Sequence, residues 1–439
     1  MESPVRLSVA AAGGGGSSDW AELLEDILLT VMEQLDIPDL VRSGAVCGWW
    51  RSASDAVRRA RFPLPSSAQQ LPCLFYACKD CSPAASAAVH CPFTGESVRV
   101  PFPLAPVAGH AVVGAGHGWV VTADENSNLL LFNPITGAQA SLPPITGIRH
   151  VETVAGEARR DCIYHRVVLS RSPSSAGPGA CVALMAHMSY GELSFARLGD
   201  ERWTSISPDE HPHLGRSACG FGDFFHDDDD GIFYALRFDG SICTLDLNGD
   251  SPVVKQITGR VPPLWFPPTV YILRAPWGDI LQVRRWRRYF DLVLQTDALS
   301  SSHLTLSRLK VDDDGLKPIT RFDELVNPYR ELRTVDIEVL KVDFDRRSAV
   351  KMSSLDDHAL FLGYNTTMCL STKDYPMLKP NCAYITDDTS EYIGNRKNGW
   401  REIGIWDMKA KSLQRFECAE DSPPWLNWPT PVWIKPSFL

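Results

Sequence analysis

A short strand–turn–strand pattern recurs through most of this 439-residue chain. Each copy has two apolar residues, a small polar residue, a turn, and then a second strand. The clearer copies span residues 131–143, 244–257, 341–352 and 405–416, and degenerate copies span residues 89–101 and 194–206. The polar side chain can bond back to the turn backbone, and Gly or Asn supplies the positive φ that a hairpin requires. Repetition of one small β unit predicts a β-propeller, whose radial arrangement leaves few exposed sheet edges.

The spacing of the copies is uneven. The gap between Asp246 and Asp343 is about twice the ~40–50 residues of a propeller blade. Either a seventh blade or an insertion fills this gap. The arginine-rich stretch 284–309 and the polar stretch 312–328 favour an insertion. We therefore expect six blades rather than seven.

The N-terminal part of the chain has a different periodicity. Leu24, Ile27, Leu28, Val31 and Leu35 recur at steps of three and four residues, which predicts one apolar stripe on a helix. A break at residues 36–39 starts a second helix, and a third apolar cluster follows at residues 46–50. Three short helices in about 40 residues have too little interior to bury this much Leu, Ile and Trp. Part of this apolar surface is therefore expected to bind a partner.

This N-terminal pattern resembles the F-box, a module that docks a substrate receptor to a Skp-type adaptor and thence to a cullin ubiquitin ligase. The matching residues are Trp20, Leu23, residues 25–28, Leu35, residues 37–40, Val46, Cys47, Trp50 and Arg51. The resemblance implies a small three-helix F-box. It also implies an adaptor-binding surface formed by Leu23, Leu24, Ile27, Leu28, Val31, Leu35, Ile37, Pro38, Leu40, Val46, Cys47, Trp50 and Arg51. The alternative is a plain helical hairpin packed on the rest of the protein.

Two departures from the F-box pattern bear on adaptor binding. Leu24 stands where the family usually has a helix-starting proline, and Gly44 and Gly48 replace bulkier or basic residues. Glycine inside a helix costs roughly 0.5–1 kcal/mol relative to alanine. We therefore expect the later helices to be short or frayed.

The C-terminal half carries a second resemblance. Residues 354–388, followed by residues 405–408 and 433–437, resemble the KIB-type β-propeller, which is found behind F-boxes in plants. The resemblance implies a plant origin and the architecture of a substrate receptor, without naming a substrate. We expect a disordered leader at residues 1–17, an F-box at 18–62 and the propeller at 63–439.

Composition excludes several classes of function. The net charge of −10 argues against general nucleic-acid binding, which depends on neutralising phosphates. No apolar run approaches the ~20 residues that span a bilayer, so no membrane association is expected. Twelve cysteines without a signal-peptide pattern indicate reduced thiols in the cytoplasm or nucleus.

The sequence offers little that points to catalysis or to a metal. Cys78, Cys81, His90 and Cys91 could begin a zinc site, but adjacent strand residues point to opposite faces, so we expect ordinary thiols. Glycine-rich phosphate loops, GxSxG elbows and HExxH helices are absent from the sequence. We expect no cofactor and no metal.

One basic–aromatic cluster is a candidate target-binding site. It pairs four arginines with Trp286 and Tyr289 within residues 284–289. We expect Arg285, Trp286 and Arg288 to bind the target from a propeller loop. The alternative is a strand packed against the neighbouring blade.

The sequence thus predicts a multidomain α plus all-β protein that acts as the substrate-recognition subunit of an SCF-type ligase. Two alternatives stay open. One is a hydrolase-like propeller enzyme, which would need paired acids in the central channel. The other is a ligase-independent protein-binding scaffold.

Overall fold

The structure is a computed structural model, and it describes a defined part of the chain. The described residues are 23–35, 37–61, 71–77, 86–102, 110–124, 128–145, 148, 164–174, 179–187, 192–207, 211, 220–259, 268–295, 305–308, 330–389, 401–416 and 429–437. The chain divides into two compact units, Met1–Pro63 and Leu64–Leu439. The predicted leader at residues 1–17 lies outside the described residues. Among the described helices, none is long and apolar enough to cross a membrane.

The N-terminal unit contains the helices of the structure. They are α1 (Glu25–Gln34), α2 (Ile37–Ser43) and α3 (Gly48–Arg61). Leu24 is the N-cap of α1, with φ −58° and ψ 140°. Glu25 and Asp26 follow in the first turn, where negative charge is favoured by the helix dipole.

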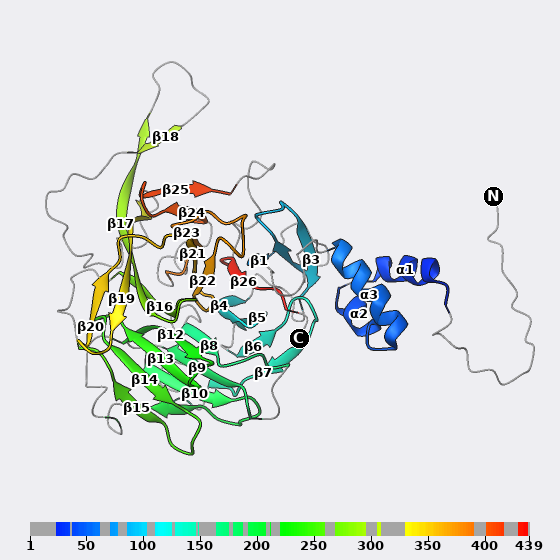
Figure 1. Ribbon diagram of the computed structural model, residues 1–439, viewed down its shortest axis with the longest axis horizontal. Helices are drawn as coiled ribbons and strands as arrows, with labels where there is room; N and C mark the ends of the chain where they lie inside the picture. Colours follow the sequence, from blue (N-terminus) through cyan, green and yellow to red (C-terminus); the bar gives the residue numbers. More distant parts are fainter. Residues whose placement is uncertain are drawn as a thin grey trace, which may run out of the picture. The chain divides into compact units, whose positions relative to one another are not determined.

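The strands of the second unit form sheets that we number as blades 1 to 6 (Figure 1). From the centre outward, blade 1 contains β26 (Val432–Ile434), β1 (Cys73–Ala77), β2 (Ser86–His90) and β3 (Ser97–Pro101). Blade 2 contains β4 (Ala111–Gly116), β5 (Trp119–Ala123), β6 (Leu129–Phe132) and β7 (Gln139–Ser141). Blade 3 contains β8 (Tyr164–Leu169), β9 (Val182–His187), β10 (Glu192–Arg197) and β11 (Thr204–Ile206).

Blades 4 to 6 continue this arrangement. Blade 4 contains β12 (Phe221–Asp227), β13 (Ile232–Arg237), β14 (Ile242–Asp246) and β15 (Val253–Gln256). Blade 5 contains β16 (Thr269–Arg274), β17 (Ile280–Gln295), β19 (Arg330–Asp343) and β20 (Ser348–Lys351), and β18 (Thr305–Arg308) pairs with β17. Blade 6 contains β22 (Met368–Ser371), β21 (His358–Leu362), β23 (Cys382–Ile385), β24 (Gly404–Asp407) and β25 (Ser412–Arg415). The prediction of six blades is confirmed.

The inner strands surround the centre of the propeller. Contacts run from β26 to β4, β8, β12, β16 and β22 in turn. These strands are short apolar runs such as those of β4 and β16, which suits strands covered on both faces. The apolar cores lie between neighbouring blades; between blades 2 and 3, for example, Trp119, Leu131 and Met185 are buried together.

The turn chemistry of the repeat matches the prediction. Asn133 Oδ1 accepts hydrogen bonds from the backbone N–H groups of Ile135 and Thr136, at 2.9 and 3.0 Å. Asp407 Oδ1 accepts hydrogen bonds from the backbone N–H groups of Lys409 and Ala410, at 2.8 Å each. A polar residue at the end of the strand next to the outer one therefore fixes the turn into the outer strand of each of these blades.

The long gap in the repeat belongs to one blade. Asp246 ends β14 and Asp343 ends β19, and these are the third strands of blades 4 and 5. The extra length lies in the long strands β17 and β19 and in the chain between them, which includes β18 (Figure 1). The described strands form no additional sheet in this interval.

The ring is closed by the two ends of the propeller sequence. Strand β26 pairs with β1 in antiparallel register, with Trp433 opposite Leu74 and Ile434 opposite Cys73. Trp433 is completely buried. Blade 1 is therefore completed by the C-terminal strand.

Candidate protein-interaction site

The helical unit has a small core of its own. Leu28 and Met32 of α1, Leu40 of α2, and Ala53 and Val57 of α3 are buried together. Leu29, Leu35 and Trp50 are partly buried and pack against them. This core holds the three segments in place.

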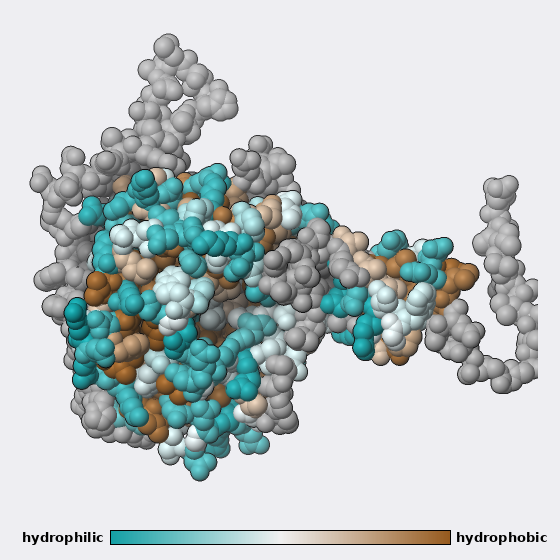
Figure 2. Space-filling model, in the orientation of Figure 1, coloured by the Kyte–Doolittle hydropathy of each residue, from teal (hydrophilic) through white to brown (hydrophobic). Residues whose placement is uncertain are grey.

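A second set of apolar side chains in this unit faces solvent. Leu24, Ile27 and Val31 lie on α1, and their side chains are 71%, 49% and 46% exposed. Val46 and Trp49 are 59% and 42% exposed, and Trp49 Nε1 donates to Leu23 O at 3.3 Å. Figure 2 shows apolar surface at α1. We call these five side chains the exposed apolar face.

The predicted adaptor-binding residues separate into three groups. Leu24, Ile27, Val31, Val46 and Arg51 are exposed, and Leu23, Leu35, Cys47 and Trp50 are half-buried. Leu28 and Leu40 are fully buried, so the prediction that they contact a partner is wrong for the folded unit. The side chains of Ile37 and Pro38 lie outside the described residues. The predicted stripe on α1 is divided between core and solvent, because Leu28 is buried while Leu24, Ile27 and Val31 are exposed.

The two glycines do not lie inside helices. Gly44 lies between α2 and α3 and accepts a hydrogen bond from Arg51 Nε at 3.3 Å, and Gly48 begins α3. Helix α3 then continues to Arg61. The expectation of short or frayed later helices fits α2, which has seven residues, but not α3, which has 14, because glycine at a helix start interrupts no helical turn.

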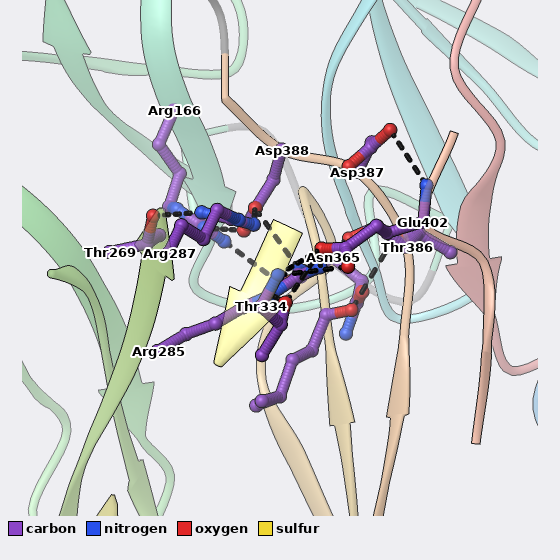
Figure 3. A network of polar contacts seen from close by, with 11 residues as sticks. Arg166, Thr269, Arg285, Arg287, Thr334, Asn365, Thr386, Asp387, Asp388 and Glu402 are labelled. Atoms are coloured by element: carbon purple, nitrogen blue, oxygen red, sulfur yellow. Dashed lines mark hydrogen bonds and ion pairs between the residues drawn. The ribbon is translucent and has the colours of Figure 1, made fainter. Parts of the chain in front are cut away.

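The predicted target-binding cluster leads to a buried polar network in the propeller (Figure 3). Arg285 lies in the middle of β17 and is completely buried. Its guanidinium donates to Thr334 Oγ1 at 2.8 Å, to Thr386 O at 2.8 Å and to Glu402 Oε2 at 3.1 Å. Arg285 therefore joins the second and third strands of blade 5 to blade 6.

Asp388 is the second centre of the network. Its Oδ1 accepts from Arg287 Nη2 at 2.6 Å and lies 3.6 Å from Arg285 Nη1. Its Oδ2 lies 3.9 Å from Arg166 Nη2. One buried carboxylate of blade 6 thus faces arginines from blades 3 and 5.

Arg166 extends the network to blade 4 and to the propeller centre. Its Nε lies 3.1 Å from Asp223 Oδ1, and its Nη1 donates to Asn365 O at 3.0 Å. The segment that contains Asn365 also reaches blade 2, because Thr366 N donates to Ala115 O at 2.6 Å. Backbone of blade 6 therefore bonds to the inner strands of blades 2 and 3.

Burial and the neighbouring arginines together set the pKa values of the acids in this network. Burial raises the pKa of Asp223 to about 6, although Arg166 and the backbone N–H of Ile272 act in the opposite direction. Burial likewise raises the pKa of Asp387 to about 6. Burial alone would raise the pKa of Asp388 too, but Arg287, Arg285 and Arg166 together hold it below its ordinary value. Asp388 is therefore the carboxylate that the arginines stabilise in its charged form.

The structure corrects the proposed position of the basic–aromatic cluster. Arg285, Trp286 and Arg288 lie on β17, so the prediction of a loop is wrong and the alternative of a packed strand applies. Arg285 is inaccessible to a partner, since its charge is satisfied inside the propeller. Trp286 is half-buried and donates from Nε1 to Glu338 Oε2 at 2.8 Å, whereas Arg288 is exposed.

Sequence reasoning missed most of the network. Asp223, Asp388 and Glu402 come from three separate segments, and none has a motif that marks it as buried. The available signal was the placement of charged residues next to apolar strands, as in the pair Asp387–Asp388 after β23. Periodicity alone cannot distinguish such a charge from a solvated one.

The described residues thus form a six-bladed propeller and a helical unit with an exposed apolar face. The family model of the KIB1-4 beta-propeller matches residues 87–407, so the chain belongs to that family. The chain is also 24% identical to the F-box protein SKIP23 of Arabidopsis thaliana, over 95% of each chain.

Similarity to solved structures is weak. A protein from Lactobacillus plantarum is matched at a TM-score of 0.33 and 10% identity, over 66% of this chain and 84% of that one. A putative 6-phosphogluconolactonase from Bacteroides uniformis is matched at a TM-score of 0.29 and 14% identity, over 65% of this chain and 95% of that one. These values carry no functional argument.

Proposed function

We propose that this protein is the substrate-recognition subunit of an SCF-type cullin ubiquitin ligase. The helical unit acts as an F-box that docks to a Skp-type adaptor and through it to a cullin, and the propeller binds a target protein. Such a subunit works in the cytoplasm or nucleus. Holding the target and the ligase together raises the target's effective concentration at the ubiquitin-transfer machinery. The observation that carries the proposal is the exposed apolar face of the helical unit.

The size of that face supports docking of an apolar partner surface. Among the described side chains of this unit, five large apolar ones are exposed, as many as the five that form the buried core. On α1, Leu24, Ile27 and Val31 follow the i, i+3, i+7 spacing of a helix that inserts one face into a groove. The similarity to an F-box protein over nearly the whole chain supports the same assignment.

Co-purification with a Skp-type adaptor tests the proposal. Replacing Ile27 and Val31 together by serine is expected to weaken adaptor binding at least about tenfold, since each change removes a central apolar contact. The matched control replaces Glu33 and Gln34, which are exposed polar residues of the same helix, and is expected to retain binding. Undiminished binding by the Ile27/Val31 variant would contradict the proposed interface.

A non-catalytic role is part of the proposal. The acids that gather near the propeller centre are bonded to arginines and to backbone N–H groups. Glu402 accepts from Thr334 N at 2.8 Å, and Asp223 accepts from Ile272 N at 2.8 Å. Buried carboxylates that are held by arginines and backbone N–H groups in this way support a structural role rather than acid–base chemistry. A chain that binds its target but retains no adaptor would instead support the ligase-independent scaffold.

A further inference from the structure

Cys91 occupies the polar position of the propeller repeat in blade 1. The sequence of residues 91–95, Cys-Pro-Phe-Thr-Gly, aligns with Asn-Pro-Ile-Thr-Gly at residues 133–137 of blade 2. The two turns also have the same backbone hydrogen bonds. Cys91 N donates to Glu96 O at 2.8 Å and Gly95 N to Cys91 O at 2.9 Å, as Asn133 N donates to Ala138 O and Gly137 N to Asn133 O, both at 2.9 Å.

This position is built to hold a hydrogen-bond acceptor. In blades 4, 5 and 6 it is taken by Asp246, Asp343 and Asp407, whose carboxylates accept backbone N–H groups of the turn at 2.8–3.0 Å. In blade 1 this position holds the sulfur of Cys91, whose pKa is lowered by the side chain of Thr94 and by the backbone of Phe93 and Thr94. A turn that elsewhere binds a carboxylate therefore surrounds a thiol, and such donors favour its anionic form.

A second thiol faces Cys91 across the sheet. The antiparallel register of β1 and β2 places Leu74 opposite His90, so Cys73 and Cys91 form the next pair. The two thiols interact, since each shifts the pKa of the other, and both residues are buried, at 1% and 6% exposure. In the reduced protein Cys73 Sγ donates to Leu71 O at 3.6 Å. Directly opposite residues have Cβ atoms about 4.5–5.5 Å apart, close to the ~3.5–4.5 Å of a disulfide. A small approach of the two strands at this pair is enough for bond formation.

The charge is divided unequally between the two sulfurs. Interaction with the Cys73 thiol, followed by interactions with Thr94 and the turn backbone, outweighs burial and lowers the pKa of Cys91 to about 6. The same interaction and burial raise the pKa of Cys73 well above its ordinary value. Cys91 is thus the nucleophile of the pair and Cys73 the resolving thiol.

We propose that Cys73 and Cys91 are a redox modification site, at which a peroxide converts the dithiol of blade 1 into an intramolecular disulfide. The Cys91 thiolate attacks one peroxide oxygen, the O–O bond breaks, and Cys91 becomes a sulfenic acid. The sulfur of Cys73 then attacks the Cys91 sulfur, forming the S–S bond and releasing water. In total, two thiols and one hydrogen peroxide give one disulfide and two waters.

The site lies where the ring closes. Cys73 is opposite Ile434 of β26 as well as being the neighbour of Cys91. A disulfide between β1 and β2 therefore fixes the strand on which the C-terminal strand is paired. Because it also restricts the unfolded chain, oxidation is expected to raise the melting temperature of the propeller.

Peptide mapping of the full-length protein after titration with hydrogen peroxide tests the proposal. We expect a Cys73–Cys91 linked peptide at peroxide concentrations that leave Cys243 and Cys382 as thiols. These two controls are also buried, but Ala235 and Gln256 lie opposite Cys243, and Ala359 and Asp407 lie opposite Cys382. Equal oxidation of all four thiols, or linkage of Cys91 to Cys78 or Cys81, would overturn the proposal.

A variant that restores the repeat provides a second test. Cys91→Asp introduces the residue that the position has in three other blades, so we expect it to fold and to melt like the reduced parent. Peroxide is expected to raise the melting temperature of the parent and not of Cys91→Asp or Cys73→Ser, and dithiothreitol is expected to reverse the change. A peroxide-induced rise of equal size in these variants would exclude the Cys73–Cys91 bond as its cause.

Discussion

Trp433 of the closing strand packs edge-on against Phe361 of blade 6, with ring centroids 5.1 Å apart and an interplanar angle of 87°. Trp433 also contacts Tyr384 and Phe416 of the same blade in perpendicular geometry. Because β26 pairs with β1, one side chain of blade 1 joins the aromatic core of blade 6. The sheet closure and the interblade packing therefore depend on the same residue.

Replacing Trp433 by alanine is expected to destabilise the propeller by about 3–5 kcal/mol, since it leaves a large cavity in this core. Urea denaturation followed by circular dichroism measures the change. Trp277→Ala is the matched control, because Trp277 is 40% exposed on the turn between β16 and β17, and its loss is expected to be much smaller. Equal midpoints for Trp433→Ala and the parent would show that the closing strand contributes little.

The Arg285–Glu402 pair allows a test of the buried network. Arg285→Met is expected to cost about 3–5 kcal/mol, because it leaves Glu402 buried without its arginine and removes one of the three arginines that face Asp388. The double variant Arg285→Met/Glu402→Gln is expected to lose less than the sum of the single changes. The control is Lys373→Met, which breaks an exposed ion pair with Asp357 and is expected to leave the denaturation midpoint unchanged. Strict additivity in the double-mutant cycle would contradict direct coupling.

Asp387 is expected to make stability depend on pH. Its pKa in the folded protein is about 6, mainly because of burial, against an ordinary value of 3.8. The folded state therefore binds this proton more tightly than the unfolded state. The stability that the proton contributes is fully present below about pH 4 and is lost as the pH rises through about 6.

Comparison with Asp387→Asn isolates this contribution from those of the other acids. Asparagine carries no charge, and its side-chain oxygen can still accept from Glu402 N, as Asp387 does at 3.1 Å. The stability of the variant relative to the parent is therefore expected to increase from pH 4.5 to pH 7.5 in urea denaturation. A pH-independent difference, or one that falls with pH, would show that the pKa of Asp387 is not raised.

Proline scanning of α1 tests the start of the helix. Leu24 has a φ of −58°, which proline adopts, and it lies at the N-cap, so Leu24→Pro is expected to preserve α1. Leu28→Pro removes the hydrogen bond from Leu28 N to Leu24 O and disrupts a core position, and should cost more than about 3 kcal/mol. Hydrogen exchange of α1 in the full-length protein measures both. Equal loss of protection in the two variants would contradict the assigned helix start.

The sequence predicted the repeating parts of the fold more fully than the interaction residues. Asn133 and Asp407 fix their turns locally, so a short pattern was sufficient to identify them and the six-bladed ring. The partners of Arg285 lie far along the chain, at Thr334, Thr386 and Glu402, and no local pattern contains that information. On α1, apolar residues occupy more than one side of the helix. Spacing alone could not decide that Leu28 faces the core and Ile27 the solvent.

The pairing of β26 with β1 has a consequence for the order of events during synthesis. Blade 1 lacks its innermost strand until the ribosome has made residues 432–434, so all the other blades are translated before the ring can close. The helical unit comes first and needs none of these strands for its own core. A nascent chain therefore presents its exposed apolar face while the edge of β1 is still unpaired, and that edge is open to pairing with other chains until residues 432–434 have been made.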